Sequence, residues 1–244
     1  MFSRIIGVIG ELLITAGVIA ALFAFYLLYW TGVENSKIQG QAADDLRSAW
    51  NQPVANAAQP DPNGAGNVLP GNEGANGSAT WAEQGNPVAF LTAPKAGINE
   101  LVAFEGVDQG TLAAGPGHYP DTALPGQVGN SSFAAHRDGN GAPFDNIDVL
   151  GTCDDITVET RDAVYHYKVL PLDGLAGAGE TFDCVPEGTE IPALPGSMIV
   201  TPDRVDVVNP SGNATMLTFT TCHPKWDNTH RLIVHAVLAG VDQK

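Results

Sequence analysis

The stretch TFTTCHPKWDNTHRLIVHAVL, residues 218–238, holds two strand-like runs separated by a polar loop. The first run is rich in β-branched residues and ends at Cys222, and the second begins at Arg231, nine positions further on. Such runs, bounded by Pro, Asn and Asp, are typical of β-strands. Two antiparallel strands joined by this loop bring the end of one beside the start of the next. The sequence therefore predicts that Cys222 and Arg231 are neighbours at a sheet rim.

Short apolar runs of the same kind continue through the second half of the chain. They lie at 88–91, 101–104, 156–158, 164–170, 198–200, 216–221 and 232–238, punctuated by Gly, Pro, Asn and Asp. The last run is apolar at nearly every position, as in a strand covered on both faces. We expect a mainly β domain over residues 81–244, closed or nearly closed into a barrel.

A thiol beside a fixed cation predicts nucleophilic chemistry. A neighbouring guanidinium favours the thiolate, and it can also donate to an oxyanion formed when sulfur attacks a carbonyl. Acyl transfer needs, in addition, a group that protonates the leaving amine, a role suited to histidine with its unperturbed pKa of about 6.5. Cys222 and Arg231 are therefore candidates for acyl transfer with a histidine partner.

Among the six histidines, His136 has the best position for this role. It ends the run SSFAAH and opens the loop RDGNGAPF, so it also lies where a strand passes into a loop. His223 follows Cys222 directly, and adjacent side chains on an extended chain point to opposite faces. We therefore expect His223 to face away from the sulfur, and His230 remains an alternative to His136.

The cysteine count separates one thiol from the other two. Thiols in an oxidising compartment tend to pair, and three cysteines leave one over. Cys153 and Cys184 flank strand-like segments 31 positions apart and are the candidate disulfide. The chain has no CxxC pair and no HExxH motif, and its loop acids lack the alternating spacing of a calcium loop. We expect neither a metal nor a cofactor.

The amino-terminal part predicts a membrane anchor. Residues 5–30 form an apolar run interrupted only by Glu11 and Thr15, long enough to cross a bilayer as a helix. The run ends in Tyr29 and Trp30, which suit the membrane interface rather than a signal-peptide cleavage site. Arg4 before the span weakly favours residues 1–4 in the cytoplasm and the remainder outside the cell membrane.

A juxtamembrane segment and a linker follow over residues 31–80. Sparse apolar positions at Val33, Ile38, Leu46 and Trp50 allow a short helix over 33–50. Residues 52–80 are dominated by Asn, Ala, Gly, Pro and Gln, which predicts a disordered tether that holds the domain near the bilayer. The whole chain has 27 acidic and 11 basic residues, a net charge of −16, so nucleic acid is an unsuitable partner.

The segment around Cys222 resembles the sortase family. The TCHP form, with an amino-terminal span, is similar to class E, and so is GPGHYPDTALPGQVGNSSFAAHRDGNGAPF over residues 115–144. The resemblance covers residues 87–241. The histidine tripeptide, usually GHR in that class, is Ala135, His136 and Arg137 in this chain, and this departure leaves the histidine in place.

The resemblance implies an eight-stranded barrel and a membrane-anchored transpeptidase. Such an enzyme cleaves an LAxTG-type or LPxTG-type sorting signal between Thr and Gly and transfers the surface protein to an amine of a lipid-linked peptidoglycan precursor. Cys222 matches the nucleophile, His136 the general acid and base, and Arg231 the group that steadies the oxyanion and substrate. Thr221 would assist locally, and Tyr119 of the GHY segment is a candidate for recognising the second position of the signal.

Three alternatives remain at this stage. NTHRL, residues 228–232, is similar to pilus-assembling class C sortases, although the chain shows neither their aromatic lid motif nor a carboxy-terminal span. An L,D-transpeptidase would also use Cys and His, but its cysteine normally lies in an SxGCxR setting. A non-catalytic tethered binding domain would need no reactive thiol at Cys222.

Overall fold

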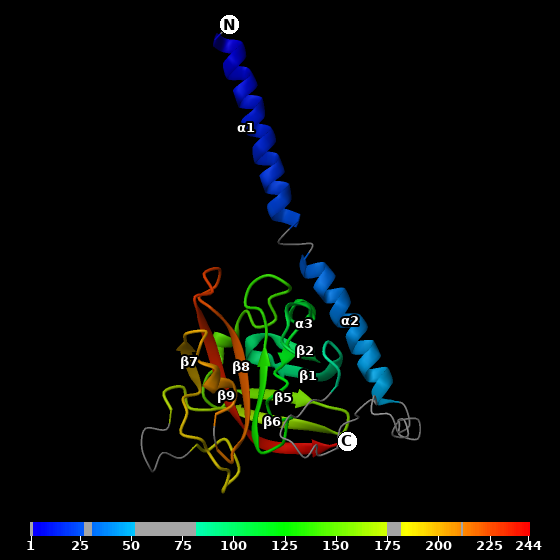
Figure 1. Ribbon diagram of the computed structural model, residues 1–244, viewed down its shortest axis with the longest axis vertical. Coiled ribbons are helices and arrows are strands. Elements are labelled where there is room, and N and C mark those ends of the chain that lie inside the picture. Colours follow the sequence, from blue (N-terminus) through cyan, green and yellow to red (C-terminus); the bar gives the residue numbers. More distant parts are fainter. Residues whose placement is uncertain (1, 27–30, 52–81, 175–181, 211) are drawn as a thin grey trace.

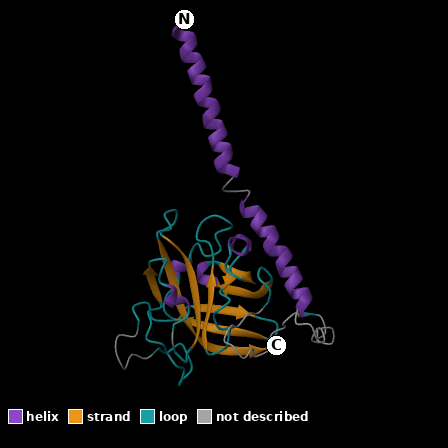
Figure 2. Cartoon of the chain, viewed as in Figure 1, coloured by secondary structure: helices purple, strands orange, loops and turns teal. Residues whose placement is uncertain are grey.

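The structure of the protein, a computed structural model, describes residues 2–26, 31–51, 82–174, 182–210 and 212–244. Helix α1 (Phe2–Phe25) projects away from the rest of the molecule, and α2 (Thr31–Trp50) runs along one side of a β-domain (Figure 1). Figure 2 shows that the domain is built mainly of strands joined by long loops. The proposed linker, residues 52–80, lies outside the described residues.

The strands form one continuous sheet. They are β1 (Pro87–Ala93), β2 (Ile98–Glu105), β3 (Gly117–His118), β4 (Gly129–Ala134), β5 (Asp155–Glu159), β6 (Ala163–Val169), β7 (Ser197–Val200), β8 (Thr215–His223) and β9 (His230–Gln243). Short helices lie between them: η3 (Pro94–Ala96), α3 (Gln109–Ala114), η4 (Ile147–Val149) and η5 (Val205–Val208).

Eight of these strands close into a barrel, the number that the family resemblance implies. The order is β6-β5-β1-β2-β3-β4-β8-β9, and pairing between β6 and β9 closes the ring. β7 stands outside the ring and pairs with the first part of β9, residues 231–234, while β6 pairs with residues 236–243. Because closure leaves these eight strands without a free edge, the barrel is a rigid frame for side chains at its rim.

The barrel interior holds the main hydrophobic core. Every second side chain of β8 and β9 points inward, and Phe219, Val234 and Ala236 pack there with Phe133 and Tyr167. The intervening residues of β9 are buried on the outer face, where Ile233 packs against Val200 and Val207. This double cover explains why residues 232–237 are apolar or buried at every position.

Helix α2 packs on the barrel beside β1 and β2. Its Ala42 and Leu46 lie in one buried cluster with Phe90, Val102 and Phe104. Gln39 adds a polar contact, because its Nε2 donates to the Val102 carbonyl at 3.2 Å and its Oε1 accepts from the Val102 N–H at 2.8 Å. The sequence-based domain boundary at residue 81 separates α2 from the barrel, whereas the structure packs the two together.

This docking changes the expected use of the linker. Trp50, at the end of α2, contacts Phe90 edge-on with ring centroids 5.4 Å apart, and Lys244 lies 4.4 Å above the Trp50 ring. Both α2 and β1 therefore belong to the barrel body, so residues 52–80 join two parts of that body. The expectation that they hold the barrel off the bilayer does not fit this arrangement, since the chain between α1 and α2 is only residues 26–30.

We expect the α2 contact to contribute measurably to stability. In a chain without the first 30 residues, Leu46→Ala should lower the free energy of unfolding by about 2 to 3 kcal/mol, because it removes a buried side chain and leaves a cavity. Asp45→Ala, at an exposed neighbouring position, should change it by about 0.5 kcal/mol or less. Urea unfolding of both variants measures the difference, and equal values would show that α2 does not support the barrel.

Candidate active site

Cys222 and Arg231 are directly opposite each other in the β8–β9 hairpin. Their Cα atoms are register partners, as are those of His223 and His230 one step further toward the loop. Side chains of directly opposite residues lie on the same face of a sheet. Both residues therefore lie on the outer face of the barrel rim, where Cys222 is half-buried and free of any disulfide. The predicted pairing of the two positions is present in the register, and Arg231 Nη1 donates to the carbonyls of Asn228 and His230.

β4 brings His136 to the same rim from the other side of β8. The two strands are parallel, with Ala134 opposite Thr220, and the pairing continues through a hydrogen bond from Ala135 N–H to the Thr220 carbonyl at 3.2 Å. Extending this register by two residues places His136 level with Cys222, on the same face by the alternation of side chains. The residues on either side of His136 also contact the residues on either side of Cys222.

Two side-chain bonds join these flanking residues. Thr221 Oγ1 donates to the carbonyl of Ala135 at 2.8 Å, and Arg137 Nη1 donates to His223 Nδ1 at 2.6 Å. Thr221 is buried, so its hydroxyl lies between the strands rather than on an exposed face. His223 points to Arg137, which agrees with the expectation that it faces away from the sulfur.

Arg137 is a site residue that sequence reasoning did not single out. Its side chain is only 3% exposed, and its Nη2 lies 2.7 Å from Asp148 Oδ2. A buried guanidinium requires partners for its charge, and Asp148, His223 and the Asp145 carbonyl supply them. Its position beside His136 was the only signal in the sequence. We name the pair of bonds at Thr221 and Arg137 the rim brace.

The rim brace predicts a measurable effect of His223. His223→Leu removes the acceptor for Arg137 and should lower kcat about tenfold, with a smaller change in KM, because it loosens the geometry of Cys222 and His136. His223→Asn places an acceptor oxygen near the position of Nδ1 and should restore most of the loss. Steady-state kinetics of the two variants, with thermal unfolding as the folding control, decide the point. Equal activity in both would remove the positioning role.

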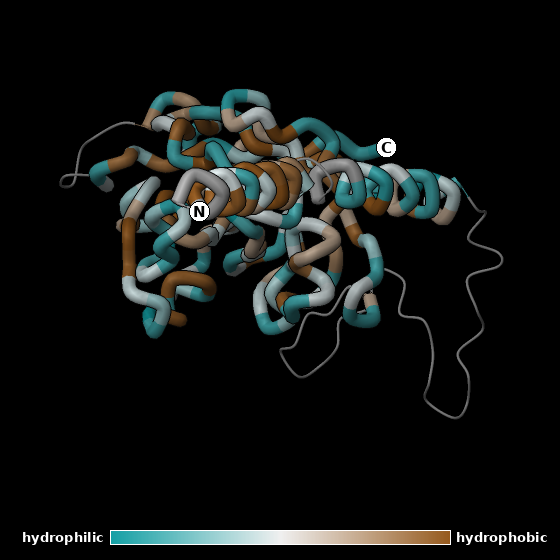
Figure 3. Tube along the Cα trace, turned by 90° about the horizontal axis from the view of Figure 1, so that it is seen from above, coloured by the Kyte–Doolittle hydropathy of each residue, from teal (hydrophilic) through white to brown (hydrophobic). Residues whose placement is uncertain are grey.

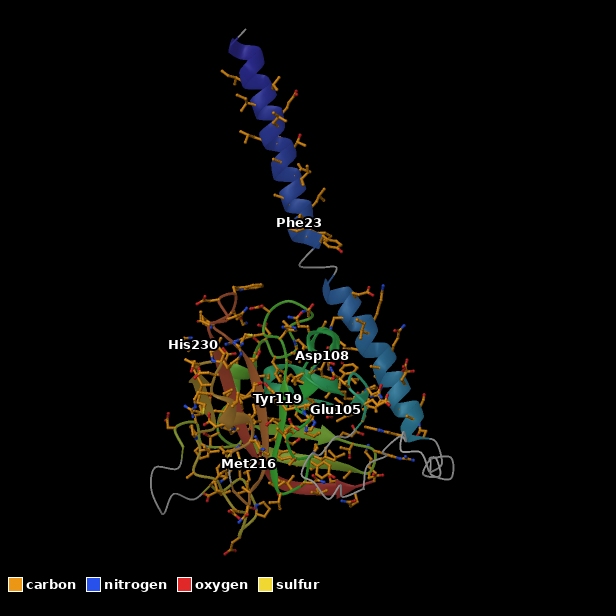
Figure 4. All side chains as sticks on the ribbon, viewed as in Figure 1. Phe23, Glu105, Asp108, Tyr119, Met216 and His230 are labelled. Carbon is orange, nitrogen blue, oxygen red and sulfur yellow. A yellow bond between two sulfur atoms is a disulfide. The ribbon has the colours of Figure 1, made fainter. Side chains whose placement is uncertain are left out.

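The structure also shows where Tyr119 and the remaining histidines lie. Tyr119 follows β3, and its hydroxyl lies 3.0 Å from Thr220 Oγ1, two residues before Cys222 on the same strand. Figure 4 labels Tyr119 on the barrel wall and His230 near the upper end of the barrel, at the start of β9. His118 is buried against Glu105, with Nδ1 3.0 Å from Oε2, and His166 pairs with Asp242.

His235 is excluded as an acid near neutral pH by its surroundings. It is buried in β9, and burial lowers the pKa of its imidazole to about 4. Its Nδ1 lies 2.8 Å from Thr218 Oγ1, and that hydroxyl also donates to Asn130 Oδ1. His235 is therefore neutral and takes part in a buried polar network beneath the outer face of β8.

Cys153 and Cys184 are joined in a disulfide, with Cα atoms 5.8 Å apart. Cys222 is thus the free thiol. Within the described ranges of the chain, no three His, Cys, Asp or Glu side chains gather closely enough to hold a metal ion.

Comparison with known proteins places this chain in a family. The sequence model of the sortase domain matches residues 91–239. The sortase SrtE2 of Streptomyces coelicolor is 29% identical over 99% of this chain and 85% of its own length, and SrtE1 of the same organism is 30% identical over 93% and 55%. Among solved structures, the SrtF sortase of Corynebacterium diphtheriae is 33% identical, covers 72% of this chain and 93% of its own, and has a TM-score of 0.58.

The barrel therefore belongs to a cysteine transpeptidase. The chain is a member of the sortase family, and its similarity to the Streptomyces proteins confirms the resemblance to class E. A solved class E structure, sortase E1 from Streptomyces coelicolor with a tripeptide in its active site, is 25% identical with a TM-score of 0.52, covering 65% of this chain and 91% of its own. Sortases in general act on proteins that carry a sorting signal and on cell-wall precursors.

Proposed function

We propose that this sortase cleaves an LAxTG-type or LPxTG-type signal between Thr and Gly through a thioester on Cys222. The observation that carries the proposal is the direct register of Cys222 with Arg231, with His136 level on the neighbouring strand. Cys222 Sγ attacks the Thr carbonyl, a C–S bond forms, and the Thr–Gly C–N bond breaks. His136 gives a proton to the leaving Gly amine, and Arg231 donates to the oxyanion.

The second half of the reaction returns the enzyme to its starting form. An amine of a lipid-linked peptidoglycan precursor attacks the thioester carbonyl, and the thiolate of Cys222 leaves. His136 accepts the proton from the attacking amine, so no proton or electron is lost over the cycle. α1 carries an apolar window at Ile6–Phe23, coloured mostly brown in Figure 3, which supports a role as the single-pass anchor of an extracytoplasmic domain.

We place the sorting signal along the outer face of β8. A cavity of about 680 Å³ lies at the Met216 end of this face, away from Cys222, and is lined by Met198, Val207 and Met216. Met216 and Cys222 are six residues apart on one strand, about 20 Å, which suits an extended peptide that ends at the sulfur. Tyr119 lies between the two along β8 through its contact with Thr220 and is our candidate for reading the second position of the signal.

Arg231 should affect the chemical step less completely than the nucleophile does. Its Nη1 donates to the carbonyls of Asn228 and His230, which hold the guanidinium at the β8–β9 loop. We expect Arg231→Ala to reduce kcat/KM by about 100-fold to 1,000-fold, the effect of losing an oxyanion donor. Arg161→Ala, in the turn between β5 and β6, is the matched loss of one cation. If steady-state kinetics gave Arg231→Ala and Arg161→Ala the same kcat/KM, Arg231 would not be the oxyanion donor.

The experiment that tests the function is intact-mass analysis of the chain without its first 30 residues. The protein is mixed with LAxTG-type and LPxTG-type peptides, and we expect an adduct on Cys222 that ends in Thr. The preferred peptide tests the assignment of Tyr119, whose variant Tyr119→Phe should change the ratio of the two adducts. Folded, reduced protein that forms no adduct with either peptide would overturn the proposed signal.

A further inference from the structure

The start of α2 must lie close to the end of the apolar helix. α1 ends at Phe25 and α2 begins at Thr31. The six Cα–Cα steps from Phe25 to Thr31 reach at most about 22 Å. The start of α2, and the part of the barrel that packs on it, are therefore held near the apolar span.

That part of the barrel is its active-site end. Near the beginning of α2, Asn35 Nδ2 donates to the carbonyls of Ala113 at 3.0 Å and Ala114 at 3.2 Å. The Asn35 side chain also lies against Gly141, where an added Cβ would collide with Asn35 Oδ1. Gly141 belongs to the loop that follows His136. The first turns of α2 thus rest on the active-site loop rather than on the distant end of the barrel.

The β8–β9 loop shares this end of the molecule. Asp138 Oδ2 accepts a hydrogen bond from the backbone N–H of Trp226 at 2.8 Å, and Lys225 pairs with Asp145. Figure 1 shows the tip of this loop and the loop after β4 at the end of the barrel where α1 ends and α2 begins, and Figure 3, seen from above, shows α1 over the barrel. We name the loops 137–144 and 224–229 the active-site rim.

Trp226 is the exposed apolar side chain of this rim. It is 75% exposed, the highest value among the large apolar side chains of the described residues. Its backbone is fixed by Asp138, so the indole is held outward on an anchored loop. Tryptophan favours the membrane interface, where its ring meets acyl chains and its N–H meets headgroups or water.

We propose that the active-site rim rests on the lipid headgroups of the bilayer that holds α1, with Trp226 inserted at the interface. This inference rests on the proposed membrane-anchored sortase. A chain with a net charge of −16 gains little from anionic lipid, so the contact depends on the short connection and the indole rather than on basic residues. The thioester on Cys222 would then form at the same surface as a lipid-linked amine.

The test is quenching of Trp226 fluorescence by brominated lipid. The full chain is placed in phosphatidylcholine nanodiscs whose acyl chains carry bromine near the headgroup, or carry none. The signal of Trp226 is the difference between the natural chain and Trp226→Phe. We expect bromine to reduce this signal, with an emission maximum at shorter wavelength than in the chain without its first 30 residues.

Two controls make the result specific. Val241→Trp, in the Trp226→Phe background, puts an indole at the far end of β9, ten residues or about 33 Å from Arg231, and it should not be quenched. Insertion of 20 Gly and Ser residues after Tyr26 adds a coil with an r.m.s. span of about 25 Å and should abolish quenching of Trp226. Equal quenching at both ends of the barrel, or none at Trp226, would overturn the rim contact.

A second measurement distinguishes failure of the membrane contact from failure of the proposed function. The same nanodiscs are mixed with the sorting-signal peptide, and the adduct on Cys222 is measured by mass. An adduct without quenching of Trp226 refutes the rim contact and leaves the transpeptidase intact. Quenching without an adduct supports the membrane contact and counts against the proposed signal.

Discussion

Cys222→Ala should abolish the acyl adduct and all transfer while the barrel stays folded. No other group in the proposed site can form the thioester, because the other two cysteines are joined in a disulfide. The half-buried thiol at the rim makes few packing contacts, so we expect the free energy of unfolding to change by about 1 kcal/mol or less. Intact mass after incubation with peptide measures the first effect, and urea unfolding measures the second.

Cys222→Ser is the closest control for this prediction. It keeps the size of the side chain and an attacking oxygen, but a hydroxyl is a weaker nucleophile than a thiolate at neutral pH. We expect its activity to fall nearly as far as that of Cys222→Ala. Alkylation of the folded protein, with its disulfide intact, should add one label to the natural chain. It should add none to Cys222→Ala or to Cys222→Ser. Transfer at the natural rate by Cys222→Ala would refute the mechanism.

The hairpin register was predictable because it depends on local sequence. The end of β8 and the start of β9 are separated by one short loop, so the polar loop between two strand-like runs fixes Cys222 opposite Arg231. Six of the seven apolar runs chosen from the sequence lie wholly in strands, and the seventh, 164–170, extends one residue beyond β6. β3, in contrast, has only two residues, Gly117 and His118, too few to leave a periodic pattern.

The contacts that sequence reasoning missed join residues far apart in the chain. Arg137 and His223 are 86 positions apart, and Gln39 and Val102 are 63 apart. Each pair forms only because the barrel closes or because a helix docks on it. Neither pair therefore produces a recognisable spacing pattern in the sequence. Apolar residues predict the helix over 33–50, yet polar side chains, among them Asn35 and Gln39, hydrogen-bond it to the barrel. For this reason the sequence predicts a juxtamembrane segment, whereas the structure makes α2 part of the domain.

His136→Ala should lower the rate of peptide acylation by about 1,000-fold or more. General acid–base catalysis contributes about 100-fold to 10,000-fold, and without His136 the leaving Gly amine must depart without a placed proton. Barrel stability should be retained, because His136 lies after the end of β4 and is half-buried. The matched control is His166→Ala, a half-buried histidine that pairs with Asp242 and should keep full activity.

A change of leaving group separates the proton donor from the nucleophile. A peptide thioester in place of the Thr–Gly amide releases a thiolate, with a pKa of about 8.5 for its thiol, which leaves without a proton. Because this leaving group needs no proton from His136, His136→Ala should acylate with the thioester within about tenfold of the natural chain. Cys222→Ala should fail with either substrate. If His136→Ala were equally impaired with amide and thioester, His136 would act in binding rather than in proton transfer, and His230, the register partner of His223 at the same rim, would be the next candidate for the acid.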